Sequence, residues 1–519
     1  MKRNLLKTLG ITFLIYVVLS WLIPVGTYSN GELSTSSINP IGLGSLFNTP
    51  ISALITFILY GVVFAVIGGF YGVARETGAL DKVVVRMTNA YKGKESKFLV
   101  LTIVLFIVLS SLTGLVLPLF VLVPLFAAVL FALNYDKVTV LAATVGSLLV
   151  GSVVSTYGFN VTGYTKNLLS LNMNSQIISK LILLVLLTVL YVFTILLSSK
   201  KKNVKKVKAE TKKAEVKEVR KETKNVSTKN STSKKSTSTK KTANKSGKSS
   251  GKKGNTKALA VIENVKMVPS DSKKSATAFV VILILMLIVA FVGMYNWYYS
   301  FGIDLFNNIH QAIMGVKIKD FPIFEKLFGG ISQFGYWSNI DFAALLIATS
   351  MLLAWVYKLS VNEYVESFIA GAKKWLPTAI YATLASVILV VLYQALQSGT
   401  GTLVDTIMAK VFGLASGFNP VITGVSALIG SFFFNDLYYL LADMTPFVTG
   451  YGIADISIAG LVIQSVHSAA MMIFPTSVVL IAGLSLFDVS YKDWIKYIWR
   501  FILISLLLVL LVCSIVTLL

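Results

Sequence analysis

The chain has 519 residues, of which 55% are hydrophobic and 13% are charged, and it contains repeated apolar runs of 18 or more residues. This composition excludes a soluble globular protein and predicts a polytopic α-helical membrane protein. The formal net charge is +24, but residues 198–275 hold 25 Lys and Arg against 6 Asp and Glu, so +19 of that charge lies in one segment.

The first elements predict an N-terminus in the cytoplasm. Lys2 and Arg3 precede an apolar run over residues 9–25, which is too long for a signal peptide and has no cleavage site after it. The following loop, residues 28–50, has no Lys or Arg, whereas the segment after the second apolar run, 51–73, is basic. Because cytoplasmic loops carry the excess of basic residues, we expect residues 1–50 to form one transmembrane helix and an extracellular loop.

Residues 51–197 are predicted to form a first repeat. The apolar block 98–133 is short for two crossings and has small polar residues in its middle, which favours a re-entrant hairpin; two short, tightly joined spans are the alternative. Residues 138–171 are predicted to form a transmembrane helix that is broken by polar and glycine residues near Ser155 and Asn160. Residues 177–197 then return to the cytoplasm.

The Lys-rich segment 198–275 is predicted to be a disordered cytoplasmic linker, because its composition cannot bury a core. Clustered lysines next to a membrane can attract anionic headgroups, and a plain solvated connection is the other interpretation. No aromatic residues alternate with the lysines, so no nucleic-acid partner is expected. Residues 276–375 follow as scaffold helices with a long extracellular loop.

Residues 376–519 are predicted to form a second repeat, with a hairpin at about 420–450 and a broken helix over 455–484. When Gly78 is aligned with Gly401, the two hairpin tips, Thr113-Gly114 and Asn435-Asp436, lie 34 to 36 residues further on. The loop charges indicate that the two copies enter the membrane from opposite sides and that the C-terminus is extracellular. Inverted repeats with broken helices are typical of secondary transporters, whose binding site lies between the repeats.

Several motifs carry a resemblance to a known family. The opening over residues 21–28, Trp-Leu-Ile-Pro-Val-Gly-Thr-Tyr, and the Gly-rich stretch 68–73 before Thr77-Gly78-Ala79-Leu80-Asp81 resemble the anaerobic C4-dicarboxylate carriers and related basic amino-acid antiporters. The C-terminal half, with Gln464-Ser465-Val466-His467 and Pro475-Thr476-Ser477, also resembles citrate-metal symporters. Both groups belong to the ion transporter superfamily.

This resemblance implies hairpin tips that meet the broken helices, a homodimer formed through a scaffold domain, and elevator-like movement driven by Na⁺ or H⁺. The chain departs from the family pattern at three places. Thr113-Gly114 stands at the first tip without an acidic pair, Asn160 is followed by Val161 instead of proline, and the second tip carries Asn435-Asp436.

The candidate substrate-binding residues are the polar and small residues of both tips and both breaks: Ser110, Ser111, Thr113, Gly114, Ser155, Thr156, Asn160, Thr162, Asn435, Asp436, His467, Thr476 and Ser477. Asp436, Asn160 and Asn435 are also candidate ligands of the coupling ion. For Asp436 the alternative is a carboxylate at the water interface, and for His467 it is a histidine that only packs between helices.

Taken with the resemblance, the sequence predicts a secondary active transporter, either a symporter or an antiporter, that moves a small organic anion or amino acid across the plasma membrane. Na⁺ or H⁺ is the expected coupling ion, and no other cofactor or metal is expected. Two alternatives stay open: a basic amino-acid exchanger with the same fold, and a channel or membrane scaffold tethered by the basic linker. No nucleophile-base pair or metal-ligand cluster is found in the sequence, so an enzyme is not expected.

Overall fold

The computed structural model describes residues 2–29, 32–35, 37–199, 275–397 and 402–518. Of these, the side chains of residues 2, 3, 29, 45, 49, 50, 53, 160, 162 and 388–397 are not described. Most of the predicted Lys-rich linker, residues 200–274, therefore lies outside the described residues. In the part that is described, eight helices are long and apolar enough to cross a membrane.

Four helices form one side of the molecule, which we call the scaffold: α2 (Leu43–Glu76), α12 (Ala276–Met294), α16 (Asn339–Val356) and α17 (Val361–Gln397). Close packing of α2 against α17 depends on glycine. A Cβ atom on Gly68 would lie 2.5 Å from Cγ of Trp375, and one on Gly72 would lie 2.9 Å from the Cα atom of Gly371. Small residues let two membrane helices approach closely enough for extensive van der Waals contact, so these glycines fix the scaffold.

The rest of the helical body consists of two sets of elements with the same order. The first set is α3 (Ala79–Tyr91), α4 (Glu95–Thr113), α5 (Val116–Leu119), η1 (Phe120–Leu122), α6 (Val123–Ala132), α7 (Lys137–Leu141), the π-helical turn η2 (Ala142–Gly146), α8 (Ser147–Val153), α9 (Phe159–Leu169) and a helix over Ile177–Ser199. The second set is α18 (Leu403–Phe412), α19 (Pro420–Phe433), α20 (Leu437–Val448), α21 (Ile453–Ala470), α22 (Val478–Phe487) and α23 (Tyr491–Leu518).

Each set contains a helical hairpin and a broken helix. Hairpin 1 comprises α4 to α6 and hairpin 2 comprises α19 and α20. The helix of the first set is interrupted at residues 154–158, here called break 1, and that of the second set at residues 471–477, here called break 2. Both sets therefore have the same order of elements, as the matching spacing of the two hairpin tips in the sequence predicted.

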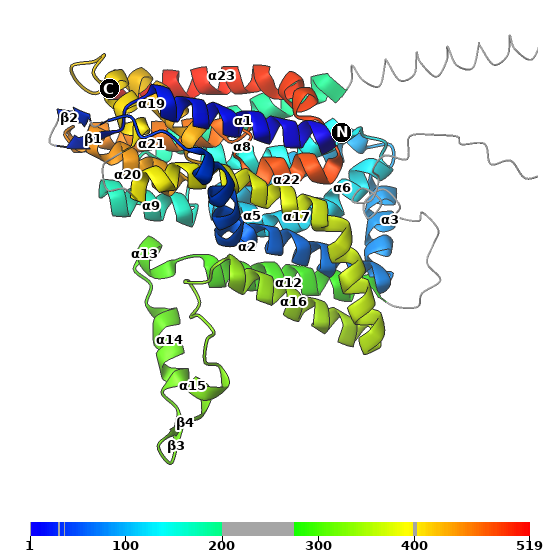
Figure 1. Ribbon diagram of the computed structural model, residues 1–519. Coiled ribbons are helices and arrows are strands. Elements are labelled where there is room, and N and C mark those ends of the chain that lie inside the picture. The colour runs from blue at the N-terminus through cyan, green and yellow to red at the C-terminus, as the bar shows by residue number, and fades with distance from the viewer. Residues whose placement is uncertain (1, 30–31, 36, 200–274, 398–401, 519) are drawn as a thin grey trace, which may run out of the picture.

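The two hairpins enter the body from opposite sides. The helix α1 (Lys2–Leu22) begins at one side and α23 ends at the other (Figure 1), and we call these the N-terminal side and the C-terminal side. Gly26, just after α1, exchanges two backbone hydrogen bonds with Thr402, which places the start of α18, the helix that leads into hairpin 2, on the C-terminal side. The helix α3, which leads into hairpin 1, lies on the N-terminal side (Figure 1). The expected fold class, an all-α polytopic membrane protein with inverted repeats, is confirmed.

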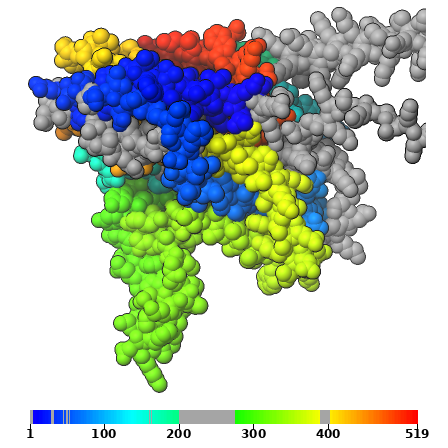
Figure 2. All heavy atoms as spheres, viewed as in Figure 1, coloured from blue at the N-terminus to red at the C-terminus, as the bar shows by residue number. Residues whose placement is uncertain are grey.

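The strands are short and form two separate pairs. The strands β1 (Gly26–Ser29) and β2 (Glu32–Thr35) pair antiparallel after α1. A second pair, β3 (Lys317–Ile318) and β4 (Phe321–Pro322), lies in an extension between α12 and α16 that also holds α13 (Trp297–Phe301), α14 (Leu305–Met314) and α15 (Ile323–Leu327). We call this extension, residues 297–336, the finger, because it projects away from the helical body (Figures 1 and 2).

The root of the finger contacts the first broken helix. Tyr295 directly follows α12, is 2% exposed, and donates its hydroxyl to the carbonyl of Tyr157 in break 1 at 2.6 Å. Burial raises the pKa of Tyr295, so this hydroxyl keeps its proton and acts as the donor. Lys166 on α9 donates from Nζ to the carbonyl of Tyr299 in α13 at 2.8 Å. The end of α12 and the root of the finger are therefore linked to the first broken helix by two polar contacts.

Candidate substrate site

The tip of hairpin 1 lies directly against break 1. Gly114 ends α4 with a φ of 70°, a left-handed conformation that glycine adopts without steric cost. A Cβ atom on Gly114 would lie 2.9 Å from the Cα atom of Gly158, which belongs to the break. Glycine is therefore required here both for the turn and for the approach of the two backbones.

Two serines join hairpin 1 to the first broken helix. Ser110 donates its hydroxyl to the carbonyl of Leu148 at 2.7 Å, and Ser111 donates to the carbonyl of Val154. The carbonyl of Ser111 in turn accepts from the amide of Thr156 at 3.0 Å. Breaking a helix at membrane depth frees backbone groups that need new partners, and these side chains supply them.

Hairpin 2 is joined to the second broken helix in the same manner. Asn435 at its tip donates from Nδ2 to the carbonyl of Thr476 in break 2 at 3.1 Å. Ser431, one turn earlier, lies 3.1 Å from Nδ1 of His467 on α21. The serine hydroxyl also donates to the carbonyl of Ala427 on its own helix, and the tautomer of His467 decides which atom donates in the Ser431–His467 contact.

A buried hydrogen bond connects the two repeats at break 1. Gln464 on α21 is fully buried and donates from Nε2 to the carbonyl of Ser155 in break 1 at 3.0 Å. The second broken helix therefore supplies a partner for a backbone group that the first one leaves free. The tip of hairpin 1, break 1 and α21 are thus joined by hydrogen bonds.

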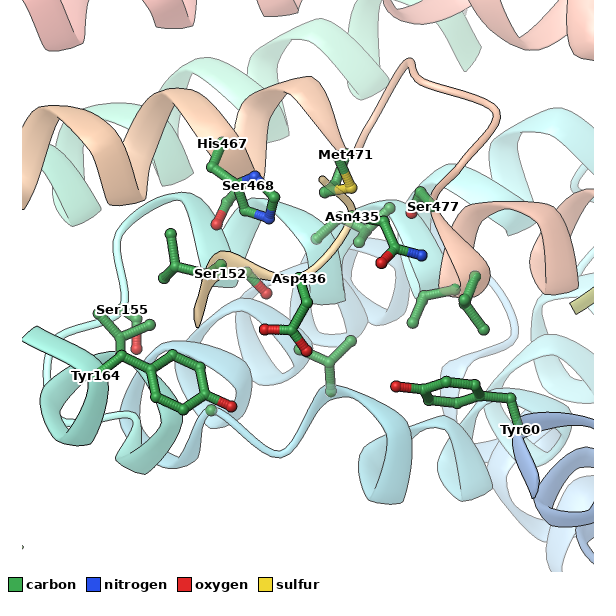
Figure 3. A pocket seen from close by; sticks show the side chains of 17 residues that line it. Tyr60, Ser152, Ser155, Tyr164, Asn435, Asp436, His467, Ser468, Met471 and Ser477 are labelled. Atoms are coloured by element: carbon green, nitrogen blue, oxygen red, sulfur yellow. The ribbon is translucent and has the colours of Figure 1, made fainter. Parts of the chain in front are cut away.

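A cavity of about 230 Å³ lies where these elements meet (Figure 3). Its lining comes from both tips, both broken helices and, on α2, Tyr60 of the scaffold. The volume is below the usual range of pockets for drug-sized ligands, which fits a small metabolite. The lining residues are Tyr60, Gly114, Val116, Leu149, Ser152, Ser155, Val161, Tyr164, Asn435, Asp436, Leu437, His467, Ser468, Met471, Ser477, Val478 and Val479.

Asp436 is the one carboxylate among the described lining residues, and none of them is Lys or Arg. One of its oxygens, Oδ1, accepts from the amide of Tyr438 at 2.8 Å and so caps α20. The carboxyl group lies between the rings of Tyr60 and Tyr164, whose hydroxyls point toward it (Figure 3). The negative charge at the site is therefore surrounded by aromatic rings and hydroxyl groups.

A second type of binding group faces the cavity at the start of α22. Ser477, Val478 and Val479 form the first residues at this helix end and line the cavity. The first amide groups of a helix have no partner within the helix, and its N-terminus attracts negative charge. This end of the cavity can therefore receive a carboxylate, while Asp436 can receive a proton or a cation.

The candidate residues from the sequence fall into three groups. Lining the cavity are Gly114, Ser155, Asn435, Asp436, His467 and Ser477. Bonded to the backbone behind it, or buried beside it, are Ser110, Ser111, Thr113, Thr156 and Thr476. Asn160 and Thr162 lie in the first turn of α9, and their side chains are outside the described part of the structure.

Sequence reasoning did not select Tyr60, Tyr164, Ser468 or Met471, which also line the cavity, nor the cross-repeat donor Gln464. Tyr60 comes from a helix more than 370 residues away from Asp436, and no motif connects the two. A weak signal existed for Gln464, because an uncharged polar side chain inside an apolar span needs a partner within the protein. Across the described residues no group of three or more His, Cys, Asp or Glu could hold a metal ion.

Comparison with known proteins identifies the family. The family model of the DcuC C4-dicarboxylate anaerobic carriers matches residues 5–518. The chain belongs to this family. Among solved structures, this carrier is similar to the Alcanivorax borkumensis YdaH transporter, with 12% sequence identity and a TM-score of 0.38 over 99% of this chain and 98% of that one. No curated protein matches the carrier.

Proposed function

We propose that the carrier is a secondary active transporter that moves a small organic anion across the cell membrane by alternating access. The observation that supports this most is the cavity, which is lined by two hairpin tips that enter from opposite sides and by two broken helices. Binding between inverted repeats lets one site face either side of the membrane in turn. The match to a carrier family agrees with this function.

We propose an elevator-type movement, in which the hairpins and broken helices move together past the scaffold. Support comes from the polar contacts: Ser111 joins hairpin 1 to break 1, Asn435 joins hairpin 2 to break 2, and Gln464 joins the two repeats. These bonds favour movement of the whole site as one body. Tyr60, on α2, would then lie on the stationary wall.

The proposed coupling ion is Na⁺ or H⁺, held near Asn435, Asp436 and Asn160. The second broken helix offers buried oxygens for such an ion. Within the described part of the chain, Oγ1 of Thr476 and Oε1 of Gln464 are buried and have no hydrogen-bond partner. Unpaired buried oxygens are costly, and hydroxyl and amide oxygens are ligands that suit a hard cation.

Counterflow in proteoliposomes tests the transporter function. Vesicles are loaded with unlabelled succinate, a four-carbon dicarboxylate, and uptake of labelled succinate is followed in Na⁺ and in K⁺, with and without a pH gradient. Saturable uptake that the internal substrate accelerates supports a carrier. Uptake that neither saturates nor responds to the internal substrate would instead support a channel, and would refute the proposal.

A second candidate substrate is a small amino acid, favoured by the position of Asp436. A bare dianion would meet a carboxylate in a cavity whose described lining has no Lys or Arg. An ammonium group would be attracted to Asp436 and could donate to the hydroxyl oxygens of Tyr60 and Tyr164. Aspartate and succinate differ chiefly by this amino group, so their competition for uptake separates the two candidates.

The variant Asp436→Asn sharpens this comparison. If the ammonium group binds Asp436, the variant loses aspartate uptake by at least tenfold and keeps uptake of succinate. Asp455→Asn, in the first turn of α21 and outside the cavity, is the control and should leave both unchanged. Equal effects of Asp436→Asn on both substrates would assign Asp436 to the coupling ion instead.

A further inference from the structure

The finger exposes many large apolar side chains and has no core of its own. None of its three helices, α13, α14 and α15, contains a buried residue. Its exposed large apolar residues are Tyr298, Tyr299, Phe301, Ile303, Leu305, Ile309, Ile313, Val316, Ile318, Phe321, Leu327, Phe328, Ile331, Phe334 and Tyr336. Contiguous apolar surface of this extent indicates contact with something other than water.

The longest helix of the finger is amphipathic. Leu305, Ile309 and Ile313 are spaced four residues apart on one face of α14 and are 56%, 45% and 43% exposed. Asn307 and Gln311 lie on the opposite face. A helix with one apolar and one polar face is suited to a boundary between an apolar and an aqueous phase.

The finger runs in the direction expected for an element that lies along the membrane surface. The finger leaves the body at the C-terminal end of α12 and runs across the axes of α12 and α16 instead of along them (Figure 1). Both helices are candidate membrane spans with exposed apolar side chains, such as Ile288 on α12 and Met351 on α16. The finger therefore leaves the body next to two candidate membrane spans that expose apolar side chains.

The charged and aromatic residues of the finger indicate which region of a membrane it would contact. It carries three basic and three acidic residues, so its net charge is zero: Lys317, Lys319, Lys326, Asp304, Asp320 and Glu325. Attraction to anionic headgroups requires an excess of basic residues, which the finger does not have. At its root it has Trp297, Tyr298 and Tyr299, residue types that concentrate at the membrane-water interface.

We propose that the finger lies in the interfacial layer of the bilayer on the C-terminal side, with Leu305, Ile309 and Ile313 inserted among the lipids. The partner is the lipid surface itself, without preference for headgroup charge. The bilayer next to the scaffold lies in the path of the finger, so this contact requires no further molecule. A second copy of the chain, which the apolar surface could also contact, is an alternative that the experiment separates.

Depth-dependent fluorescence quenching tests the proposal on the full-length carrier. Cys513, the one cysteine in the chain, is replaced in Cys513→Ala, and Ile309→Cys or Gln311→Cys is added for labelling with a small fluorophore. The proteins are reconstituted into vesicles of zwitterionic lipid whose acyl chains are brominated near the glycerol. We expect at least threefold stronger quenching at residue 309 than at residue 311, and no change when anionic lipid is added.

Two results would overturn the proposal. Equal, weak quenching at both positions would place α14 in water. Disulfide cross-linking between copies through Ile309→Cys, with quenching no stronger than at residue 311, would assign the apolar face to a second copy of the chain. Succinate counterflow by the labelled proteins serves as the folding control, because the labels lie far from the cavity.

Discussion

Replacing Gly114 with alanine should displace the tip of hairpin 1 from break 1. Two separate costs are expected. The φ of 70° costs alanine roughly 1–2 kcal/mol relative to glycine. The new Cβ atom would also lie 2.9 Å from the Cα atom of Gly158, and such overpacking costs about 1–3 kcal/mol.

A matched variant separates these two costs. Gly93 has a φ of 80°, but no atom lies within 4 Å of the position its Cβ atom would occupy. Gly93→Ala should therefore carry the conformational cost alone, of about 1–2 kcal/mol. Gly163→Ala, in the helix α9 and also without a close neighbour, should carry neither cost, because alanine is the better helix former.

The assay combines thermal unfolding of the purified carrier in detergent with counterflow in proteoliposomes. We expect Gly163→Ala to resemble the wild type, Gly93→Ala to unfold at a slightly lower temperature with normal transport, and Gly114→Ala to lose both stability and most transport. The transport loss follows because Gly114 lines the cavity. If Gly114→Ala matched Gly93→Ala in both assays, the close approach of the tip to the break would be refuted.

Two further predictions concern the contacts that hold the body together. Gln464→Leu should lower the melting temperature and slow transport, because the substitution leaves the buried carbonyl of Ser155 without its partner, at a cost of about 1–3 kcal/mol. An unchanged melting temperature and an unchanged transport rate would contradict this hydrogen bond. Gly68→Val should reduce the yield of monodisperse protein in size-exclusion chromatography, because the valine side chain would overlap Trp375. Gly44→Val, whose side chain meets no neighbour, should leave the yield unchanged. Equal yields of the two variants would argue against close packing of α2 and α17.

The architecture could be predicted because it depends on local patterns. Runs of apolar residues indicated the spans, and polar or glycine residues at membrane depth indicated the tips and breaks, for example Gly114 and Asn435. Matching intervals along the chain indicated the repeats. Loop charges indicated that the repeats are inverted, and the opposite entry of the two hairpins agrees with it.

The composition of the site could be predicted only in part, because sequence position does not show which way a side chain points. Ser110 and Ser111 have the polarity expected of ligands, but they are fully buried and bond to the backbone of the first broken helix. Tyr60 reaches the cavity from α2 through packing between distant segments. Helix ends also differed: α17 begins at Val361, well before the expected start near residue 376, because its first turns are polar.

The hydrogen bond from Tyr295 to the carbonyl of Tyr157 has a thermodynamic consequence for the conformational cycle. Any rearrangement that separates the end of α12 from break 1 must break this bond, whose net contribution is about 1 kcal/mol. A difference of that size changes the ratio of two conformations roughly fivefold. Since the finger begins two residues later, the same ratio would depend on bilayer thickness, so lipids with longer or shorter acyl chains should bias the resting state of the carrier.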